Sequence, residues 1–422
     1  WSSDVCSSDL IKMEQNIKKT FLSSVLFFLI LSSWYNIRSV RNELAVENYG
    51  EGLLIPLLIV TTLTMIFVNP IYSWVASRAN YIKIVFYTYS FFILNFIILY
   101  FIANSIDASM TDERIWLGRV FYVWSNIYSF FTVSIFWVLV INLFRDLRSR
   151  NYYGFIMAGG SVGAMLGSQI SKWLSSSFIS SGITQYLIVS LFFLLVALIL
   201  AVYMVKTFSN DALTKNVGGS SFDGLRNIIS NKDVRLIAIY SWFFTFLMTI
   251  QWIAAIPIIN DYSELAPERI ILFSNIEQLV TPLTFIVQTF LTYFVISKYG
   301  IKLIFIIYGI LFSLVFILYG FFPSVVIVGL CQTLLRVFEY GFNKPAREIA
   351  FSQLRKGDRY KSTVFIDTFI TRFGDLSGSI FMGIGKAIFG SVTYLPIVAI
   401  PLAFIHTFVA RLIFSRNTFK DL

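Results

Sequence analysis

The sequence has few of the residues from which metal sites, disulfide frameworks and catalytic pairs are built. It contains two cysteines, Cys6 and Cys331, and one histidine, His406. A Cys/His metal site, a Cys/His catalytic pair and a disulfide framework each need more members than this. We therefore expect no metal ion and no cofactor. His406 lies in the last apolar stretch, where a packed or hydrogen-bonded helix residue is favoured over a proton relay.

Charged residues are also scarce. They make up 13% of the chain, whereas hydrophobic residues make up 57% and the mean hydropathy is +0.75. An ordinary soluble domain has roughly 25% charged residues. Apolar runs of about 20 residues, enough to cross the hydrocarbon core of a bilayer, recur from residue 21 almost to the C-terminus. The sequence predicts an all-α polytopic membrane protein with about twelve transmembrane helices.

The formal net charge of +10 is explained by membrane topology and not by a nucleic-acid partner. Lysine and arginine gather at both ends of the chain and in alternate loops between the apolar runs, whereas acidic residues gather in the intervening loops. The positive-inside rule then places both termini in the cytoplasm, with an even number of spans. We expect a multi-pass protein of a bacterial cytoplasmic (inner) membrane, in contact with the lipid bilayer.

The predicted domains follow from two six-helix halves. Residues 1–12 lack an initiator methionine and are expected to be a non-native leader, with Met13 as the start. Residues 13–205 form the N-terminal half, residues 206–233 a cytoplasmic linker with an amphipathic helix, and residues 234–422 the C-terminal half. Similar basic turns at residues 77–83 and 297–302 fall at equivalent positions of the two halves, as an internal repeat would place them.

The densest charge beside an apolar helix lies in residues 343–379. Asp367, Thr371 and Asp375 recur every four residues and share one helix face, and Arg372 is close enough to pair with Asp375. An ionised side chain at the middle of a bilayer costs roughly 2.5 to 3.5 kcal/mol on insertion scales. This face is therefore expected to point into the helix bundle or a wet cavity. It predicts a transport site, to which Lys344, Arg347 and Glu348 also belong.

Charged residues near the end of the first helix predict a second site. Arg38 and Arg41 share a face and precede Glu43. They could snorkel to an interface, but the acidic residues that follow indicate the outer end, where arginine is less expected. An anion site that faces the bundle is favoured. In the fourth helix, Arg119 is placed near the outer end and Asn142 near the inner end.

Three further features leave alternatives open. Glu277, in the eighth helix, could bind a coupling ion or be solvated at the outer interface. Arg336 and Glu339, in the tenth helix, lie three residues apart, so a paired structural role and a substrate role are equally supported. In residues 154–168, Gly159, Gly163 and Gly167 lie four residues apart, which favours tight helix packing over a phosphate-binding loop.

Four separated stretches resemble the ATP:ADP antiporter family, the nucleotide exchangers of plastids and intracellular bacteria, which form an outlying branch of the major facilitator fold. Residues 35–46 are similar to the first-helix pattern of that family, and residues 219–229 to the helix between its halves. The other two stretches carry the following matching residues: Phe136, Trp137, Asn142 and Arg150 before the glycine-rich fifth helix; then Pro345, Glu348, Lys361, Asp367, Arg372, Gly374 and Gly378.

The resemblance implies alternating access between two halves, with Arg38 and Arg41 meeting a substrate anion. It also implies that charged residues of helices ten and eleven gate the pathway or bind substrate. The chain departs from the family at three positions. Lys344 replaces the acidic residue that usually precedes the proline, Arg41 replaces a lysine, and Asn42 replaces an acid. Nucleotide specificity therefore does not follow from the resemblance.

We predict a secondary transporter of the major facilitator type that moves an organic anion. A nucleotide or another phosphorylated metabolite is the leading candidate substrate, and a counter-substrate or a proton is a candidate coupling partner. The alternative is proton-coupled export of a hydrophobic or cationic compound, with Glu277, Asp367 or Asp375 as proton carrier. No nucleophile has a neighbouring histidine, so an enzyme is not expected. The predicted substrate-binding residues are Arg38, Arg41, Arg119, Asn142, Arg336, Lys344, Arg347 and Arg372. The predicted coupling or gating residues are Glu43, Glu277, Glu339, Glu348, Asp367 and Asp375.

Overall fold

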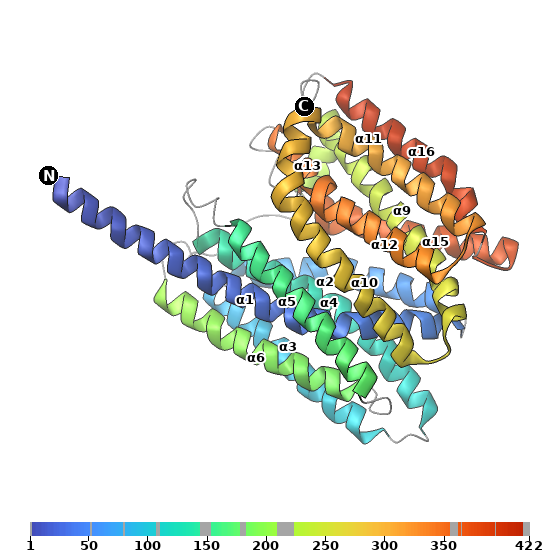
Figure 1. Cartoon of the computed structure of the whole chain (residues 1–422), viewed down its shortest axis with the longest axis horizontal. Helices are drawn as coiled ribbons and strands as arrows, with labels where there is room; N and C mark the ends of the chain where they lie inside the picture. Colours follow the sequence, from blue (N-terminus) through green and yellow to red (C-terminus); the bar gives the residue numbers. More distant parts are fainter. Residues whose placement is uncertain are drawn as a thin grey trace. The chain divides into compact units, whose positions relative to one another are not determined.

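The computed structural model describes residues 2–50, 53–78, 81–106, 110–143, 153–177, 183–208, 223–354, 362–363, 365–392 and 394–416. Every regular element among these residues is a helix, as the hydropathy predicts (Figure 1). The side chains of residues 69–82 and of Asn142 lie outside the description, and so do Arg150 and Lys361, which the sequence comparison used.

The described helices form twelve long segments, which confirms the predicted all-α polytopic architecture. In chain order these are α1 (Ser2–Gly50), α2 (Leu54–Arg78), α3 (Tyr81–Ser105), α4 (Thr111–Leu143), α5 (Tyr153–Ser177), α6 (Thr184–Thr207), α9 (Lys232–Tyr262), α10 (Ala266–Ile286) with η2 (Val287–Leu291), α11 (Thr292–Phe321), α12 (Val325–Phe338) with η3 (Glu339–Asn343) and α13 (Lys344–Ser352), η4 (Ile366–Ile370) with α15 (Thr371–Phe389), and α16 (Leu395–Phe414). The short α8 (Asp223–Ser230) lies in the predicted linker.

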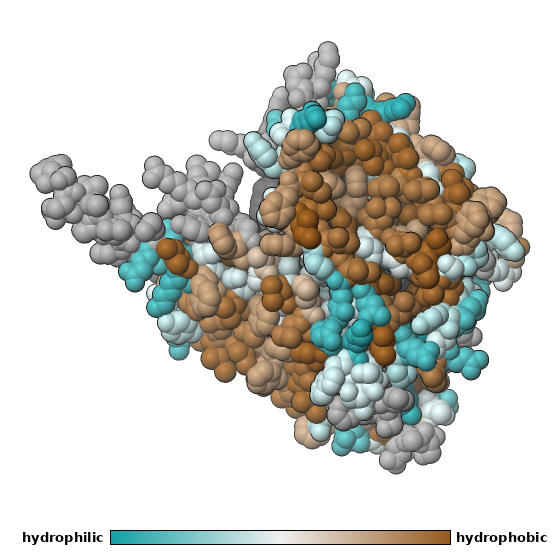
Figure 2. Space-filling view, viewed as in Figure 1, coloured by the Kyte–Doolittle hydropathy of each residue, from teal (hydrophilic) through white to brown (hydrophobic). Residues whose placement is uncertain are grey.

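Within the described part of the chain, eight segments are long and apolar enough to cross a membrane by length and composition. One of them, Ala266–Phe321, contains α10, η2 and α11. Large apolar side chains such as Phe290, Tyr293 and Leu330 are exposed. The face drawn in Figure 2 is covered mainly by such side chains. An exposed apolar surface of this extent is what a lipid-facing protein requires.

Local sequence signals set several helix ends. The Asn231 side chain accepts a hydrogen bond of 2.9 Å from the backbone N–H of Asp233 and caps α9. Ser324 caps α12 in the same way, through the N–H of Ile327. Gly390 ends α15 with φ +71°, a conformation that glycine adopts without steric cost. Gly300, also at φ +71°, breaks the helical geometry of α11 inside the basic turn predicted at residues 297–302.

Two compact units divide the chain. The first consists of Trp1–Asn42, Trp74–Gly218 and Ile270–Gln278, and the second of Glu43–Ser73, Gly219–Arg269 and Leu279–Leu422. Three helices, α1, α2 and α10, contribute residues to both units. Each compact unit consists of three separate segments, so the units do not test the boundaries predicted at residues 205 and 233. These boundaries stay a prediction.

In the first unit, α5 packs on α1 at backbone distance. A Cβ atom added to Gly163 would lie 2.2 Å from the carbonyl oxygen of Phe28, and one added to Gly167 would lie 2.5 Å from that of Ser32. Ser32 also donates a hydrogen bond of 3.2 Å to the carbonyl oxygen of Gly163. The predicted tight packing of the glycine-rich helix is confirmed. These small residues let the two helices approach without intervening side chains.

Neutral polar groups join α1, α4 and α6 in a buried row that we call the neutral seam: Ser33, Asn36, Tyr128 and Ser190. The Ser33 and Tyr128 hydroxyl oxygens lie 2.6 Å apart, and Ser33 donates to the carbonyl oxygen of Ser190 at 2.9 Å. Asn36 donates to the Ser190 hydroxyl and to the carbonyl oxygen of Tyr186, both at 2.9 Å. The neutral seam therefore connects three helices without using charge.

In the second unit, α11 lies beside α16 and α9 beside α15 (Figure 1). Buried aromatic rings fill the space between α9 and α11, where Tyr240 stacks on Phe305 with ring centroids 4.3 Å apart. Among the described residues, the π-helical segments η2, η3 and η4 all belong to this unit. A π-helical turn widens the backbone and exposes carbonyl groups, and such turns are frequent at functional sites.

Candidate functional site

The charged stretch predicted at residues 343–379 occupies three elements of the second unit. Lys344, Arg347 and Glu348 lie on α13, Asp367 on η4, and Arg372 on α15 together with Asp375. Lys344 and Glu348 are exposed, whereas Arg347 is buried. The structure thus places Lys344 and Glu348 on an exposed side of α13 and Arg347 on its buried side, whereas Asp367, Arg372 and Asp375 are partly exposed.

Arg347 is the buried cation of this stretch. Its Nη2 lies 3.6 Å from Asp367 Oδ1, and its guanidinium carbon lies 5.5 Å from the centre of the Phe244 ring. The Arg347 side chain is 7% exposed, but the Asp367 side chain is 40% exposed. Two of its donors, Nε and Nη1, have no hydrogen-bond partner among the described residues. A buried guanidinium with unused donors is suited to bind an anion.

Glu339 contributes a second carboxylate to this group from η3. Its Oε2 accepts a hydrogen bond of 2.6 Å from the side-chain NH2 group of Asn343. The side-chain oxygen of Asn343 in turn accepts a hydrogen bond of 2.7 Å from the Tyr240 hydroxyl. Glu339 also interacts electrostatically with Arg347. We call Tyr240, Glu339, Asn343, Arg347 and Asp367 the Arg347 cluster. Glu339 is one of the predicted residues, whereas Tyr240 and Asn343 are not, because neutral residues in apolar helices carry no local signal of a distant partner.

His406 lies next to this cluster on α16. Its ring is fully buried and stacks on Tyr240, with centroids 4.4 Å apart. The rings of Tyr308 and Phe312 meet it edge-on at 6.4 and 6.2 Å. Neither ring nitrogen has a hydrogen-bond partner among the described residues. The prediction of a packed helix residue is confirmed, and the packing is aromatic.

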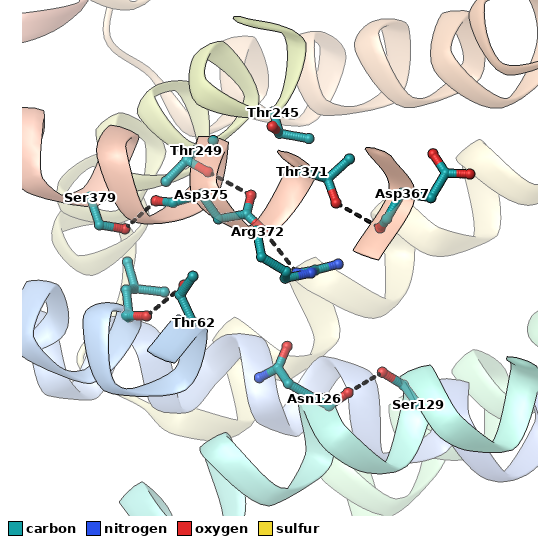
Figure 3. A network of polar contacts seen from close by, with 12 residues as sticks. Thr62, Asn126, Ser129, Thr245, Thr249, Asp367, Thr371, Arg372, Asp375 and Ser379 are labelled. Carbon is teal, nitrogen blue, oxygen red and sulfur yellow. Dashed lines mark hydrogen bonds and ion pairs between the residues drawn. The ribbon is translucent and has the colours of Figure 1, made fainter. Parts of the chain in front are cut away.

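Arg372 and Asp375 form a local ion pair, as their spacing predicts. Arg372 Nη1 donates to Asp375 Oδ2 at 2.8 Å, and the Thr249 hydroxyl donates to Asp375 Oδ1 at 3.0 Å (Figure 3). Thr371 instead donates to the backbone carbonyl of Asp367 at 2.7 Å. The prediction of a regular α-helix is wrong here: η4 places a π-helical turn over Ile366–Ile370, so the spacing from Asp367 is not that of an ideal α-helix.

In the first unit, Arg38 and Arg41 face protein groups. Arg38 Nε lies 3.3 Å from Glu277 Oε1 on α10, and its guanidinium lies 4.9 Å from the Tyr35 ring centre. Next to this pair, Ser274 donates to Ser39 at 3.0 Å. Glu277, which the sequence analysis left between coupling and solvation, is buried. In this structure, the Arg38 side chain therefore points to Glu277 and does not snorkel to an interface.

Arg41 has a mixed amide and aromatic environment. Its Nη1 donates to Asn126 Oδ1 at 2.8 Å, and its Nη2 donates to Asn42 Oδ1 at 2.6 Å. The guanidinium lies 5.3 Å from the Trp34 ring centre and 6.0 Å from that of Tyr122. Asn42, which departs from the acidic residue of the resembled family, is thus a direct partner of Arg41.

The remaining predicted residues are distributed over both units. Glu43 accepts a hydrogen bond of 2.6 Å from Arg269 in the second unit, and both side chains are buried. Arg269 was missed because it lies beside an acidic loop in the sequence, where no spacing links it to Glu43. Arg336 is buried one turn before Glu339. Arg119 lies 4.8 Å from the Trp116 ring centre on α4, and the Asn142 side chain lies outside the description.

Solved structures of other proteins share this arrangement of helices. The nucleoside transporter NupG matches with a TM-score of 0.67 at 14% identity, over 94% of this chain and 100% of that one. This chain has the major facilitator fold. A bacterial homologue of the iron transporter ferroportin, in an inward-facing state, matches with a TM-score of 0.64 at 13% identity, over 95% and 99% of the two chains. A bacterial homologue of the human lysosomal transporter Spinster, inward-facing and unoccupied, gives 0.58 at 12%, over 96% and 98%.

These structural similarities confirm the predicted major facilitator fold. At sequence identities of 12 to 14%, they show the fold and not the function. No protein-family model and no curated protein sequence matches the chain. The resemblance to the ATP:ADP antiporter family therefore stays a prediction. The names of these proteins refer to chemically different substrates, a nucleoside and iron. The substrate of this chain therefore has to be inferred from its own side chains.

Proposed function

We propose that this protein is a secondary transporter that moves an organic anion across a bacterial cytoplasmic membrane by alternating access. A nucleotide or another phosphorylated metabolite is the first candidate substrate. The fold supports transport, because the nucleoside transporter and the homologues of Spinster and ferroportin share it across nearly the whole chain. An enzymatic role has no comparable support. The predicted orientation, with both termini in the cytoplasm, is part of this proposal.

The observation that carries the choice of an anion is the environment of Arg347. Its guanidinium is buried, its contact with Asp367 is 3.6 Å long, and Nε and Nη1 have no hydrogen-bond partner among the described residues. An unpaired buried donor is unfavourable, by about 1 to 3 kcal/mol for each neutral group and by more for a charged one. A phosphate or carboxylate group accepts two parallel hydrogen bonds from a guanidinium and would remove this cost.

Arg372 extends the anion-binding character along α15. Its side chain is 32% exposed and pairs with Asp375, while its Nε has no hydrogen-bond partner among the described residues. Arg41 adds a guanidinium in the first unit, held by neutral amides and by two aromatic rings. Trp34 and Tyr122 present flat apolar faces beside that charge. An organic anion with a planar group, such as a nucleotide, combines the two chemistries that Arg41 and its rings offer.

The first test is thermal stabilisation of the detergent-purified protein by nucleotides, phosphorylated metabolites, simple organic anions and cations. A ligand that binds only the folded state raises stability by mass action, by about 2.7 kcal/mol at a hundred times its Kd. We expect ADP or another phosphorylated anion to raise the Tm of the native protein. The Arg347→Gln variant should lose that shift, and Arg41→Gln should reduce it.

The matched control is Arg416→Gln. Arg416 belongs to the same unit as Arg347 and forms an ion pair of 2.9 Å with Asp233, outside the Arg347 cluster. It should keep both the ligand-induced shift and uptake into liposomes. Equal loss in Arg416→Gln and Arg347→Gln would mean that any arginine removed from this unit damages the fold. Stabilisation only by uncharged or cationic compounds would reject the anion and favour a proton-coupled exporter on the same fold.

A further inference from the structure

The ion pair between Arg347 and Asp367 differs from three other ion pairs among the described residues of the second unit. Its nitrogen and oxygen lie 3.6 Å apart, whereas the pairs Arg372–Asp375, Arg269–Glu43 and Arg416–Asp233 are 2.6 to 2.9 Å long. At 3.6 Å the contact is electrostatic and too long for a hydrogen bond. Its guanidinium is buried while its carboxylate is 40% exposed. The Arg347 pair is thus a loose contact with one accessible partner.

Three carboxylates act on this guanidinium. Glu339 interacts with Arg347 from η3, Asp367 from η4 and the exposed Glu348 from α13. Glu339 is fixed by the Asn343 amide at 2.6 Å and is nearly inaccessible, so it cannot exchange a proton readily with water. Asp367 has no such bond to its carboxylate in the described contacts and has direct access through its exposed side. Of the three, Asp367 combines the 3.6 Å contact with Arg347 and a side chain that is 40% exposed, so a proton can reach it from water.

The charged and titratable groups around Asp367 come from several elements. Arg347 and Glu348 face it from α13, and Lys344 acts on Glu348. Tyr240, on α9, faces Arg347 and Glu339. Arg372 and Asp375 lie further along the helix of Asp367 and pair with each other. Arg347 is therefore the cation with which Asp367 forms an ion pair.

We propose that Asp367 binds a coupling proton, and that its protonation releases Arg347 to bind the substrate anion, so that proton and anion cross the membrane together. The proton comes from water and adds to an Asp367 carboxylate oxygen; no covalent bond other than this O–H bond is made or broken. The neutral carboxyl no longer attracts the guanidinium strongly. Arg347 then offers its charge and its two unused donors to the anion. This inference rests on the proposed anion transport.

Charge balance explains why the two ligands would move together. In the empty protein, the carboxylates of Asp367 and Glu339 both face the guanidinium of Arg347. An anion alone adds negative charge beside these two carboxylates, which is costly in a membrane protein. A proton on Asp367 removes one of the negative charges, so the anion then binds with less repulsion. By linkage, each ligand raises the affinity for the other by the same factor.

A ligand-free experiment tests the proton site. Infrared difference spectra of the purified protein, recorded while the pH is lowered, report the carbonyl band of a newly protonated carboxyl group. We expect a band that titrates in the native protein and in Asp233→Asn, and that is lost in Asp367→Asn. Asp233 is the matched control, because it is also an ion-paired aspartate of the second unit, at 2.9 Å from Arg416. A band that persists unchanged in Asp367→Asn overturns the proton site.

A flux experiment tests the coupling. Liposomes that contain the protein are loaded with buffer, the membrane potential is clamped with potassium and valinomycin, and uptake of radiolabelled ADP is followed under an imposed pH gradient. One proton per anion should give about tenfold accumulation for each pH unit, because one unit is a tenfold difference in proton activity. Asp233→Asn should accumulate equally. Asp367→Asn should equilibrate ADP without accumulating it, and Asp367→Glu, which keeps a titratable carboxyl, should restore accumulation.

The outcomes separate this inference from the function on which it rests. If ADP equilibrates in all variants and the pH gradient has no effect on the native protein, transport stands and proton coupling is overturned. If none of these proteins binds or transports ADP, the proposal of nucleotide transport fails. The infrared band then decides whether Asp367 is a proton site. If Asp367→Asn does not fold, the Asp367→Glu variant carries both measurements, because a shifted band and retained accumulation are expected from it.

Discussion

The neutral seam of the first unit and the Arg347 cluster of the second unit both join helices through buried polar groups, but with different chemistry. In the seam, hydroxyl and amide groups bond at 2.6 to 2.9 Å, and glycines bring α1 and α5 together at backbone distance. In the cluster, charges meet at up to 3.6 Å, on helices that contain π turns. Short neutral bonds fix one arrangement, whereas loose charges and widened turns permit more than one.

This difference assigns separate tasks to the two regions. The seam is fully buried and includes no group that changes charge at ordinary pH, so its main effect is on stability. The cluster contains a buried guanidinium and two carboxylates, so its main effect is expected on transport. Mutations can test this division, because stability and transport are measured separately.

The largest effect on stability is expected from Arg269→Gln. The substitution would leave the buried Glu43 carboxylate without its hydrogen-bonded partner. Breaking a buried ion pair in this way costs about 3 to 5 kcal/mol. Thermal unfolding in detergent measures it. The double variant Glu43→Gln/Arg269→Gln should recover most of the loss, since no lone charge remains; a double variant as unstable as the single one would show that the pair matters for shape and not for charge.

An intermediate effect is expected from Gly163→Ala in the first unit. The new methyl group would lie 2.2 Å from the carbonyl oxygen of Phe28, a backbone atom that cannot rotate away. Overpacking of this kind costs about 1 to 3 kcal/mol. Gly383→Ala is the matched control: it is also a helical glycine, but its nearest neighbour is the Ile55 side chain, at 3.1 Å. A similar fall in Tm for both would remove the case for a rigid junction between α1 and α5.

The smallest effect on stability, and the sharpest test of the comparison, comes from Ser33→Ala and Thr292→Val. Ser33 belongs to the neutral seam, whereas the Thr292 hydroxyl donates to the Gly341 carbonyl at 2.6 Å and so ties α11 to the π turn η3. Each substitution removes a hydroxyl, and each should cost about 1 kcal/mol. Liposome flux should fall clearly only in Thr292→Val, because η3 carries Glu339 and Asn343. Equal flux in the two variants would contradict the division of tasks.

The sequence predicted those features that depend on composition and on near neighbours. Apolar runs give the all-α membrane architecture, the spacing of Arg372 and Asp375 gives their ion pair, and the glycine repeat gives the packing on α1. The partners Arg269 of Glu43 and Tyr240 of Asn343 lie far away in the chain, so no local pattern indicates them. The π turns were also missed, because packing between helices and not local propensity selects them.

The single histidine of the chain gives the second unit a spectroscopic reporter of its own. His406 stacks on Tyr240, whose hydroxyl bonds to Asn343 and through it to Glu339. Aromatic ring currents shift the resonances of protons nearby, so a rearrangement that moves Tyr240 displaces the imidazole signal. With an affinity tag free of histidine, a nuclear magnetic resonance spectrum selective for histidine contains one imidazole, which needs no assignment. Addition of an anion or a change of pH can then be followed at the Arg347 cluster in the unmodified protein.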